Sequence, residues 1–206
     1  MMKITRYSAL IAAAATSTLL IAACSNAEEA APADKAAVEA TDSATQDPMV
    51  GGAAMSPNDT IVTNAAKASN LTTLVAAVQA AGLAETLGGA GPFTVFAPDN
   101  AAFEKVPVAA RESLMAPAGK ADLAKILTYH VVPGRLTAAD IAAQAQANGG
   151  TATLTTVEGG ALTVTAGPNG TWVITDENGG RSTITQADVG QSNGIVHVID
   201  TVLMPK

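Results

Sequence analysis

The chain contains little cysteine, few aromatic residues and little positive charge. It has one cysteine in 206 residues, which excludes an internal disulfide and a metal site built from several thiolates. Aromatic residues make up 3% of the chain, so few flat side chains are available to stack against a sugar. The 18 Asp and Glu residues outnumber the 11 Lys and Arg residues, and the net charge of -7 excludes a nucleic-acid-binding protein, because an acidic surface repels phosphate.

The sequence also lacks the motifs of common enzyme classes. It has no Gly-x-Ser-x-Gly nucleophile elbow, and the stretch GGAGPF at 88–93 lacks the Lys-Ser/Thr of a phosphate-binding loop. The two histidines, His130 and His197, are not spaced as metal ligands on one element. We therefore expect no catalytic residue, no metal and no cofactor. A glycan-cleaving pair of carboxylates that meets only in the fold stays open.

An export signal is present at the start of the chain. Lys3 and Arg6 precede an apolar stretch, Ala9–Ala23, that ends in the sequence LIAAC. This pattern is typical of a secretory signal with a lipobox, and the apolar run is short for a membrane span. We predict a signal peptide over residues 1–23 and lipidation of Cys24.

Residues 24–57 are rich in Ala, Asp, Glu, Thr and Pro and show no period of bulky apolar residues. Such a segment buries too little apolar surface to offset its ordering entropy, so we predict a disordered acidic tether. Ser25 after the lipidated cysteine is compatible with sorting to the outer membrane. Residues 58–206 then predict a single domain of ordinary size.

The domain divides into a helical first half and a strand-rich second half. Apolar periodicity predicts a helix over 70–82, with Asn70 as its cap, and Thr137 with Asp140 predicts a capping box for a helix that stops at Gly149. Thr- and Val-rich runs separated by Gly and Asn predict an antiparallel meander over 151–189. Two apolar runs, 92–98 and 194–205, predict central strands buried on both faces. The expected fold class is α+β.

Three stretches of the domain resemble the conserved boxes of fasciclin domains. They are GPFTVFAPDNAAF at 91–103, LTYHVVPG at 127–134 and QADVGQSNGIVHVIDTVLMP at 186–205, in the order and at about the spacing of that family. The resemblance implies a wedge of antiparallel strands flanked by helices, an adhesion or protein-interaction role, and no shared catalytic site. It also implies that the Tyr129–His130 motif is a candidate partner-binding site. The motif residues expected to be mainly structural are Phe93, Phe96, Pro98, His130, Asn193, Gly194, His197 and Asp200.

The residues themselves assign different roles to Tyr129 and His130. If 121–130 is helical, His130 continues an apolar stripe with Leu123 and Leu127, and we interpret it as a packed histidine bonded to a backbone carbonyl. Tyr129 lies about 100 degrees around the helix, where its hydroxyl would stay in solvent, either as a contact for a partner or as a rim residue without one. His197 is interpreted as packed in its strand, and Asp188 and Asp200 as acceptors for backbone N–H groups.

The leading hypothesis is a lipid-anchored, non-catalytic adhesion or protein-interaction module of the cell envelope, at the outer membrane or cell surface. Its expected partners are the membrane, through Cys24, and another envelope or extracellular protein. The alternative is a polysaccharide-binding or polysaccharide-processing module, for which Trp172 and Tyr129 are the available aromatic platforms. A purely structural envelope protein is a third possibility.

Overall fold

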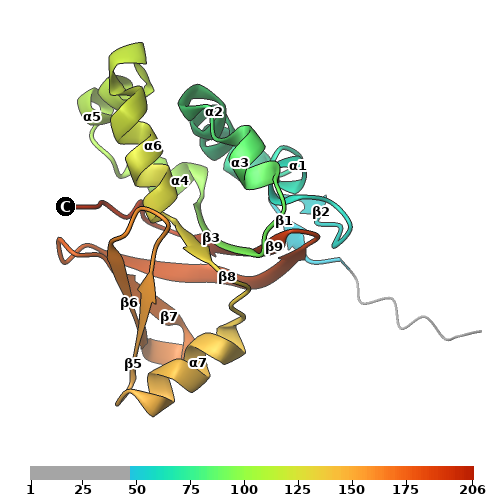
Figure 1. Cartoon of the computed structure of the whole chain (residues 1–206), viewed down its shortest axis with the longest axis vertical. Helices are drawn as coiled ribbons and strands as arrows, with labels where there is room; N and C mark the ends of the chain where they lie inside the picture. The colour runs from blue at the N-terminus through green and yellow to red at the C-terminus, as the bar shows by residue number, and fades with distance from the viewer. Residues whose placement is uncertain (1–46) are drawn as a thin grey trace, which may run out of the picture. The chain divides into compact units, whose positions relative to one another are not determined.

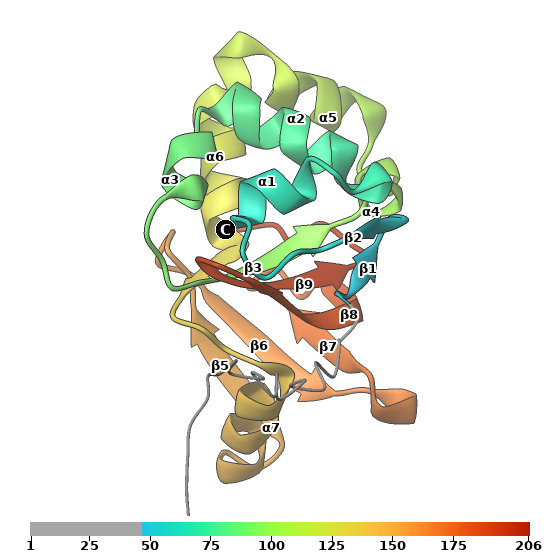
Figure 2. The same cartoon turned by 90° about the vertical axis from the view of Figure 1, so that its right-hand side faces the viewer.

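The computed structural model describes residues 47–206, which form an α+β domain built on one mixed sheet (Figure 1). The seven strands of this sheet lie in the order β4-β3-β9-β8-β7-β6-β5. Their bounds are β3 Phe93–Pro98, β4 Val131–Pro133, β5 Thr151–Thr155, β6 Ala161–Ala166, β7 Trp172–Thr175, β8 Arg181–Gln191 and β9 Gly194–Ile199. Six α-helices lie on one side of β3 and β9, and the seventh lies at the opposite end, under the meander (Figure 2). The helices are α1 Ile61–Ala65, α2 Thr72–Ala81, α3 Ala84–Gly88, α4 Asn100–Glu104, α5 Val108–Met115, α6 Lys120–Tyr129 and α7 Ala138–Ala147.

The two central strands, β3 and β9, run parallel to each other and are covered on both faces, as predicted. The strand predicted over 194–205 is shorter than expected, because β9 ends at Ile199 and residues 200–206 are not in a strand. Alternate side chains of each strand therefore enter two different cores. The helix-side core contains Leu71, Leu74, Val78, Val95, Ala97, Leu123, Leu127, Val196 and Val198. The meander-side core contains Phe96, Tyr129, Ile141, Leu154, Leu162, Val164, Ile174, Ile199 and Leu203.

The meander-side core is formed by the four-strand run β5–β8 and by α7. Each strand pairs antiparallel with the next, which confirms the predicted meander. The strands alternate between buried apolar residues facing α7 and more exposed, mostly threonine, residues on the outer face. The Thr137–Asp140 capping box that begins α7 is also confirmed.

The predicted cap of α2 is wrong. Asn70 lies in a short 3-10 turn, Ser69–Leu71, and makes no capping hydrogen bond. The side chain of Asn100, from the start of α4, takes this role by accepting from the backbone N–H of Thr73 (3.0 Å). Because Asn100 is distant from α2 in the sequence, the pattern of residues around α2 does not predict this hydrogen bond. Gly82 ends α2 with a φ of 75°, a left-handed conformation that favours glycine.

The boundary predicted between tether and domain is also corrected. Residues 47–57 include a small hairpin of β1 Met49–Val50 and β2 Ala53–Ala54, turned at Gly51 and Gly52. Val50 and Met55 are each 2% exposed, because their side chains enter the helix-side core. The predicted signal peptide, Cys24 and the rest of the tether lie outside the described residues. No helix within residues 47–206 is long and apolar enough to cross a membrane.

Candidate functional site

His130 ends α6 and joins it to the C-terminal segment of the chain. Its ring Nδ1 lies 2.8 Å from the carbonyl oxygen of Ile126, and the backbone N–H of Leu203 donates to Nε2 at 3.0 Å. A carbonyl only accepts and an N–H only donates, so Nδ1 carries the proton and Nε2 is the acceptor. The side chain is 2% exposed. His130 is therefore a buried, neutral bridge, in agreement with the interpretation of a packed histidine.

Burial governs the protonation of this ring. Removal from water lowers the pKa of His130 to about 4, against an opposing effect of its bond to the Ile126 carbonyl and of the nearby Asp176 carboxylate. Protonation would also place an N–H donor on Nε2, facing the N–H of Leu203. The bridge between α6 and the C-terminal segment therefore depends on a neutral His130.

Tyr129 lies in the meander-side core, and the expectation of a solvent-exposed hydroxyl is wrong. Its side chain is 0% exposed, its hydroxyl donates to the carbonyl of Ala161 (3.0 Å), and the same oxygen accepts from the N–H of Glu177 (3.2 Å). Burial raises the pKa of this phenol above its ordinary value. The C-terminal end of α6 lies between the two halves of the domain. The Tyr129 side chain therefore points toward β6 and not toward solvent. Neither Tyr129 nor His130 presents a side chain to a partner.

The β7–β8 loop holds the C-terminal segment beside His130. Asp176 is 7% exposed, and its carboxylate accepts from the backbone N–H groups of Met204 (3.0 Å) and Gly180 (2.7 Å). The side-chain amide of Asn178 donates to the carbonyls of Met204 (2.8 Å) and Pro205 (3.1 Å). This contact was not predicted from the sequence. The only available signal was the turn sequence DENGG, which does not reveal what the turn holds.

His197 of β9, which pairs with Phe96, makes a second neutral bridge. Its Nδ1 accepts from the backbone N–H of Asp188 (3.2 Å), and its Nε2 lies 3.0 Å from the carbonyl of Leu136. The ring stacks on Phe96, with centroids 5.6 Å apart, and burial lowers its pKa. Asp188 in turn accepts from the N–H of Ala138 at the start of α7 (2.7 Å). His197 is packed, as interpreted from the sequence.

Asn193 and Gly194 bring β3 and β9 together with the helices. The Asn193 side chain accepts from the N–H of Ile61 (3.0 Å) and donates to the carbonyls of Leu87 (2.8 Å) and Gly89 (2.9 Å). A Cβ atom on Gly194 would lie 2.0 Å from the carbonyl oxygen of Phe93, so only glycine allows this approach of the two strands.

Three further motif residues are buried or hydrogen-bonded within the domain, as expected of structural residues. Phe96 is 0% exposed in the meander-side core, and Pro98 is buried at the end of β3. Asp200 accepts from the N–H of Thr183 (2.8 Å) and lies 3.4 Å from Lys105. Burial pushes the pKa of Asp200 upward, and these bonds with those from Thr201 and Ser182 outweigh it, so the pKa is lowered. Asp188 and Asp200 both act as the predicted acceptors for backbone N–H groups.

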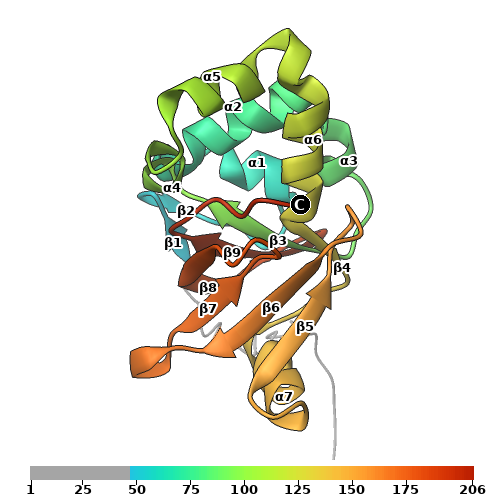
Figure 3. The same ribbon diagram turned by 90° about the vertical axis from the view of Figure 1, so that its left-hand side faces the viewer.

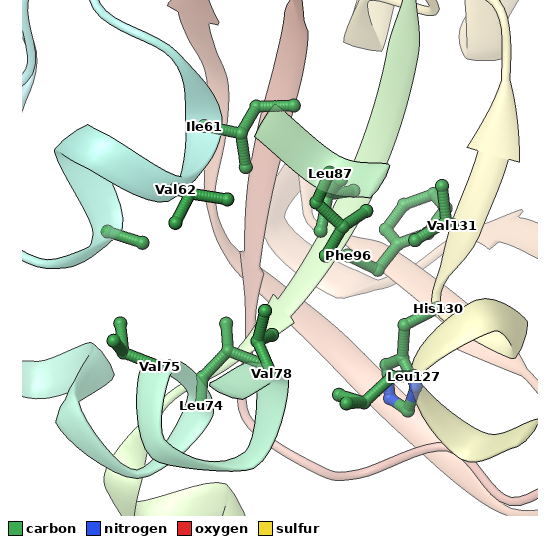
Figure 4. A pocket seen from close by; sticks show the side chains of 12 residues that line it. Ile61, Val62, Leu74, Val75, Val78, Leu87, Phe96, Leu127, His130 and Val131 are labelled. Atoms are coloured by element: carbon green, nitrogen blue, oxygen red, sulfur yellow. The ribbon is translucent and has the colours of Figure 1, made fainter. Parts of the chain in front are cut away.

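An apolar cavity of about 30 Å³ lies in the helix-side core, beside His130. Figure 4 shows Leu74, Val75 and Val78 of α2 directed into this space from one side, opposite Leu127 of α6 and His130, which follows the helix. It has almost no polar lining. The cavity is too small for a substrate and marks imperfect packing between the helices.

The open surface of the helical half lies around α5, which has no buried residue. Val108 is 58% exposed and Met115 is 38% exposed. Residues seven apart lie on the same face of a helix, so these two side chains share one side of α5. Two grooves, of about 360 and about 300 Å³, flank the helix, and Met115 lines both.

The residues expected for a sugar platform do not come together. Tyr129 is internal, and Trp172 is half-buried against the meander-side core. Within residues 47–206, no three His, Cys, Asp or Glu side chains are grouped so that they could hold a metal ion.

Residues 69–205 match the family described as Fasciclin domain. The chain belongs to this family. The match covers the three motif stretches and both histidine bridges, so the predicted family is confirmed. The fasciclin fold is also supported by a solved structure of a FAS1 domain pair from the insect cell adhesion molecule Fasciclin I. That likeness has a TM-score of 0.63 at 22% identity and covers 71% of this chain and 51% of the other.

Curated relatives of this fasciclin-domain chain occur in bacteria and animals. Protein sll1483 of Synechocystis is 41% identical over 76% of this chain and 79% of its own length. The cell surface glycolipoprotein MPB83 of Mycobacterium bovis is 32% identical over 75% and 64%. The transforming growth factor-beta-induced protein ig-h3 of Sus scrofa is 36% identical over 64% of this chain and 17% of its own length.

Proposed function

We propose that this chain is an exported, lipid-anchored protein of the cell envelope, and that its fasciclin domain binds another protein without catalysing a reaction. The observation that carries the proposal is a fasciclin domain that follows a lipobox sequence ending at Cys24. Support comes from relatives and a structural neighbour whose names place them at cell surfaces or in adhesion.

The two histidines of the domain support a binding role over a catalytic one. Both ring nitrogens of His130 and of His197 are engaged with backbone groups, and both rings are buried. A general acid or base must reach a substrate proton. The role of these residues is to fasten the C-terminal segment and α7 to the sheet, which keeps the surface helices in place.

The proposed contact surface is the exposed face of α5, defined by Val108 and Met115, with the two grooves beside it. Exposed apolar side chains gain free energy when a partner covers them, and methionine adapts its shape to different partners. Arg111, Glu104 and Glu112 line one groove and Lys120 lines the other, so charged groups of both signs surround the apolar face. An apolar segment of another envelope protein, with polar residues of both charges at its margin, would suit this surface.

The test is photo-cross-linking in intact cells, with a photoreactive residue at position 108 of the full chain. The matched control places the same residue at position 143, an exposed site on α7. We expect one specific protein to be captured from position 108 and not from 143. The substitution Met115→Asp, on the same face of α5, should abolish that capture while the domain remains folded.

Capture of nothing from position 108, or equal capture from both positions, would contradict protein binding through α5. Either result would favour an envelope polysaccharide as the ligand. The anchoring part of the proposal has a separate readout. Cys24→Ala should prevent incorporation of a labelled fatty acid and release the protein from the membrane fraction, whereas unchanged membrane association would contradict a lipid anchor.

A further inference from the structure

The strand β5 is the open edge of the seven-stranded sheet. Among the strands within residues 47–206 it pairs with β6 alone, over five successive residue pairs without a register shift. The opposite edge strand, β4, has three residues and ends in Pro133, which has no N–H to offer to a further strand. Figure 3 shows β5 at the front of the meander, with β4 approaching only one end of it.

The hydrogen-bond pattern fixes which backbone groups of β5 point outward. The N–H of Thr156 donates to Gly160 across the hairpin (2.9 Å), and bonded pairs recur at every second residue of an antiparallel ladder. Ala152 and Leu154 therefore bond to β6, and the N–H and C=O groups of Thr151, Thr153 and Thr155 point away from it. The next outward N–H, that of Val157, donates to Val131 of β4 (2.7 Å).

In the part of the chain that the structure describes, this edge has none of the usual protection against strand addition. Natural edge strands are commonly blunted by lysine, proline, a bulge or a covering element. The sequence of β5 is Thr-Ala-Thr-Leu-Thr, without charge or proline, and its ladder is regular. Thr153 and Thr155 are exposed, and Val157, just past the strand, is 49% exposed. The edge is thus open to an additional strand over the length of β5.

We propose that β5 pairs with β5 of a second copy of this chain, around a two-fold axis at Thr153. The strand is self-complementary about that point: Thr151 faces Thr155 of the partner copy, and Thr153 faces itself. Ala152 then faces Leu154 on the side covered by α7. Threonine pairs are favourable cross-strand neighbours, and this register places outward groups opposite outward groups, giving about six backbone hydrogen bonds.

Charge also favours a second copy at this edge over other surfaces. The chain carries a net charge of -7, so two copies repel each other over most approaches. The strand β5 contains no charged residue, and in the proposed register no like charges face each other. One strand pair buries little surface, so the association is weak in solution and strengthens when copies are confined to one membrane. The pairing does not depend on partner binding by α5.

The first test is cysteine cross-linking of the full chain in cells, with the wild type as the blank for Cys24. Thr153→Cys should give a disulfide-linked dimer under mild oxidation. Thr163→Cys is the matched control, because Thr163 is the cross-strand neighbour of Thr153 on the same face of β6. Across the proposed interface two Thr163 residues are separated by three strand spacings, about 14 Å, which is too far for a disulfide.

The second test measures self-association of the purified full chain in detergent by sedimentation. Thr153→Lys places two lysines opposite each other and should weaken the dimer by about tenfold or more. Thr163→Lys, on the neighbouring strand, should leave it unchanged. Circular dichroism of both variants confirms that they are folded. A monomeric wild type at all concentrations, equal cross-linking at 153 and 163, or equal weakening by both lysines would overturn the proposal.

Discussion

The two cores on either side of β3 and β9 are packed to different degrees. In the meander-side core, Ile141, Leu162, Val164 and Ile174 are each 0% exposed, and Ile184, at 7%, is the most exposed member. In the helix-side core, Leu74, Val78, Leu87 and Phe103 retain 6 to 9% exposure, and an apolar cavity remains between α2 and α6. The same central strands thus support one closely packed layer and one loosely packed layer.

The difference follows from how each half is assembled. In the meander, each strand is fixed to its neighbour by a regular ladder, so alternate side chains enter the core at fixed spacing. The helical half consists of six helices of 5 to 10 residues, which pack through side chains alone. Short pieces of this kind fill space less completely and leave apolar residues such as Val108 at the surface. The helical half is therefore the half suited to adapt to a partner, and the meander half supplies rigidity.

Truncation of one leucine in each core tests this comparison most strongly. Leu162→Ala, in the meander-side core, should lower the free energy of unfolding by about 4 to 5 kcal/mol, because fixed strands cannot close the cavity. Leu74→Ala, in the helix-side core, should cost about 2 to 3 kcal/mol, because short helices can shift into the space. Urea unfolding of both variants measures the two values. Equal losses would mean that the two cores are equally rigid.

Acid should affect the junction of the two halves through His130. The pKa of about 4 in the folded protein lies below the ordinary value of 6.5. As pH falls from 6.5 to 4, the unfolded chain therefore takes up a proton at His130 and the folded protein does not. The free energy of unfolding should decrease by about 3 kcal/mol between pH 6.5 and pH 4. Below pH 4 the protonation of His130 should cause no further decrease. His197, whose pKa is also lowered, adds a loss of the same sign.

Urea titrations at pH 7 and pH 4 measure this loss. The variant His130→Ala is less stable at pH 7, because the N–H of Leu203 loses its acceptor, but it should show a smaller loss between the two pH values. His197→Ala serves as the matched control, since it removes the other histidine and leaves the His130 contribution in place. If His130→Ala kept the full wild-type pH dependence, the buried bridge would not be the source of acid sensitivity.

Most helices and strands of the domain can be predicted from the sequence, because the residues that form them lie close together in the chain. The alternation in 151–189 predicts the meander, the Thr137–Asp140 box predicts the start of α7, and the apolar run 92–98 predicts a strand buried on both faces. The packed state of both histidines was also predictable, since each continues an apolar stripe or strand face. In these cases neighbours in sequence supply the relevant contacts.

Contacts between distant segments account for the errors. Tyr129 is buried because β6 and the β7–β8 loop lie over the end of α6, and helix geometry alone places it at a boundary. The role of Asp176 depends on the C-terminal segment, 28 residues later. The segment 47–57 has a tether-like composition, yet the side chains of Val50 and Met55 enter the helix-side core. In each case the position of a segment depends on contacts of one or two side chains with residues that are distant in the sequence.

Adding one methylene group to each core gives the smallest expected effect and the sharpest contrast. Val78 of α2 borders the cavity, so Val78→Ile should fill part of it and stabilise the protein by up to about 0.8 kcal/mol. Val164 of β6 is 0% exposed, so Val164→Ile should overpack the meander-side core and cost about 1 kcal/mol or more. Both substitutions replace valine with isoleucine. Opposite changes in the melting temperature would therefore show that the two cores differ in packing. Destabilisation by both would mean that the space between α2 and α6 cannot accept a methylene, and that the helix-side core is as closely fitted as the meander.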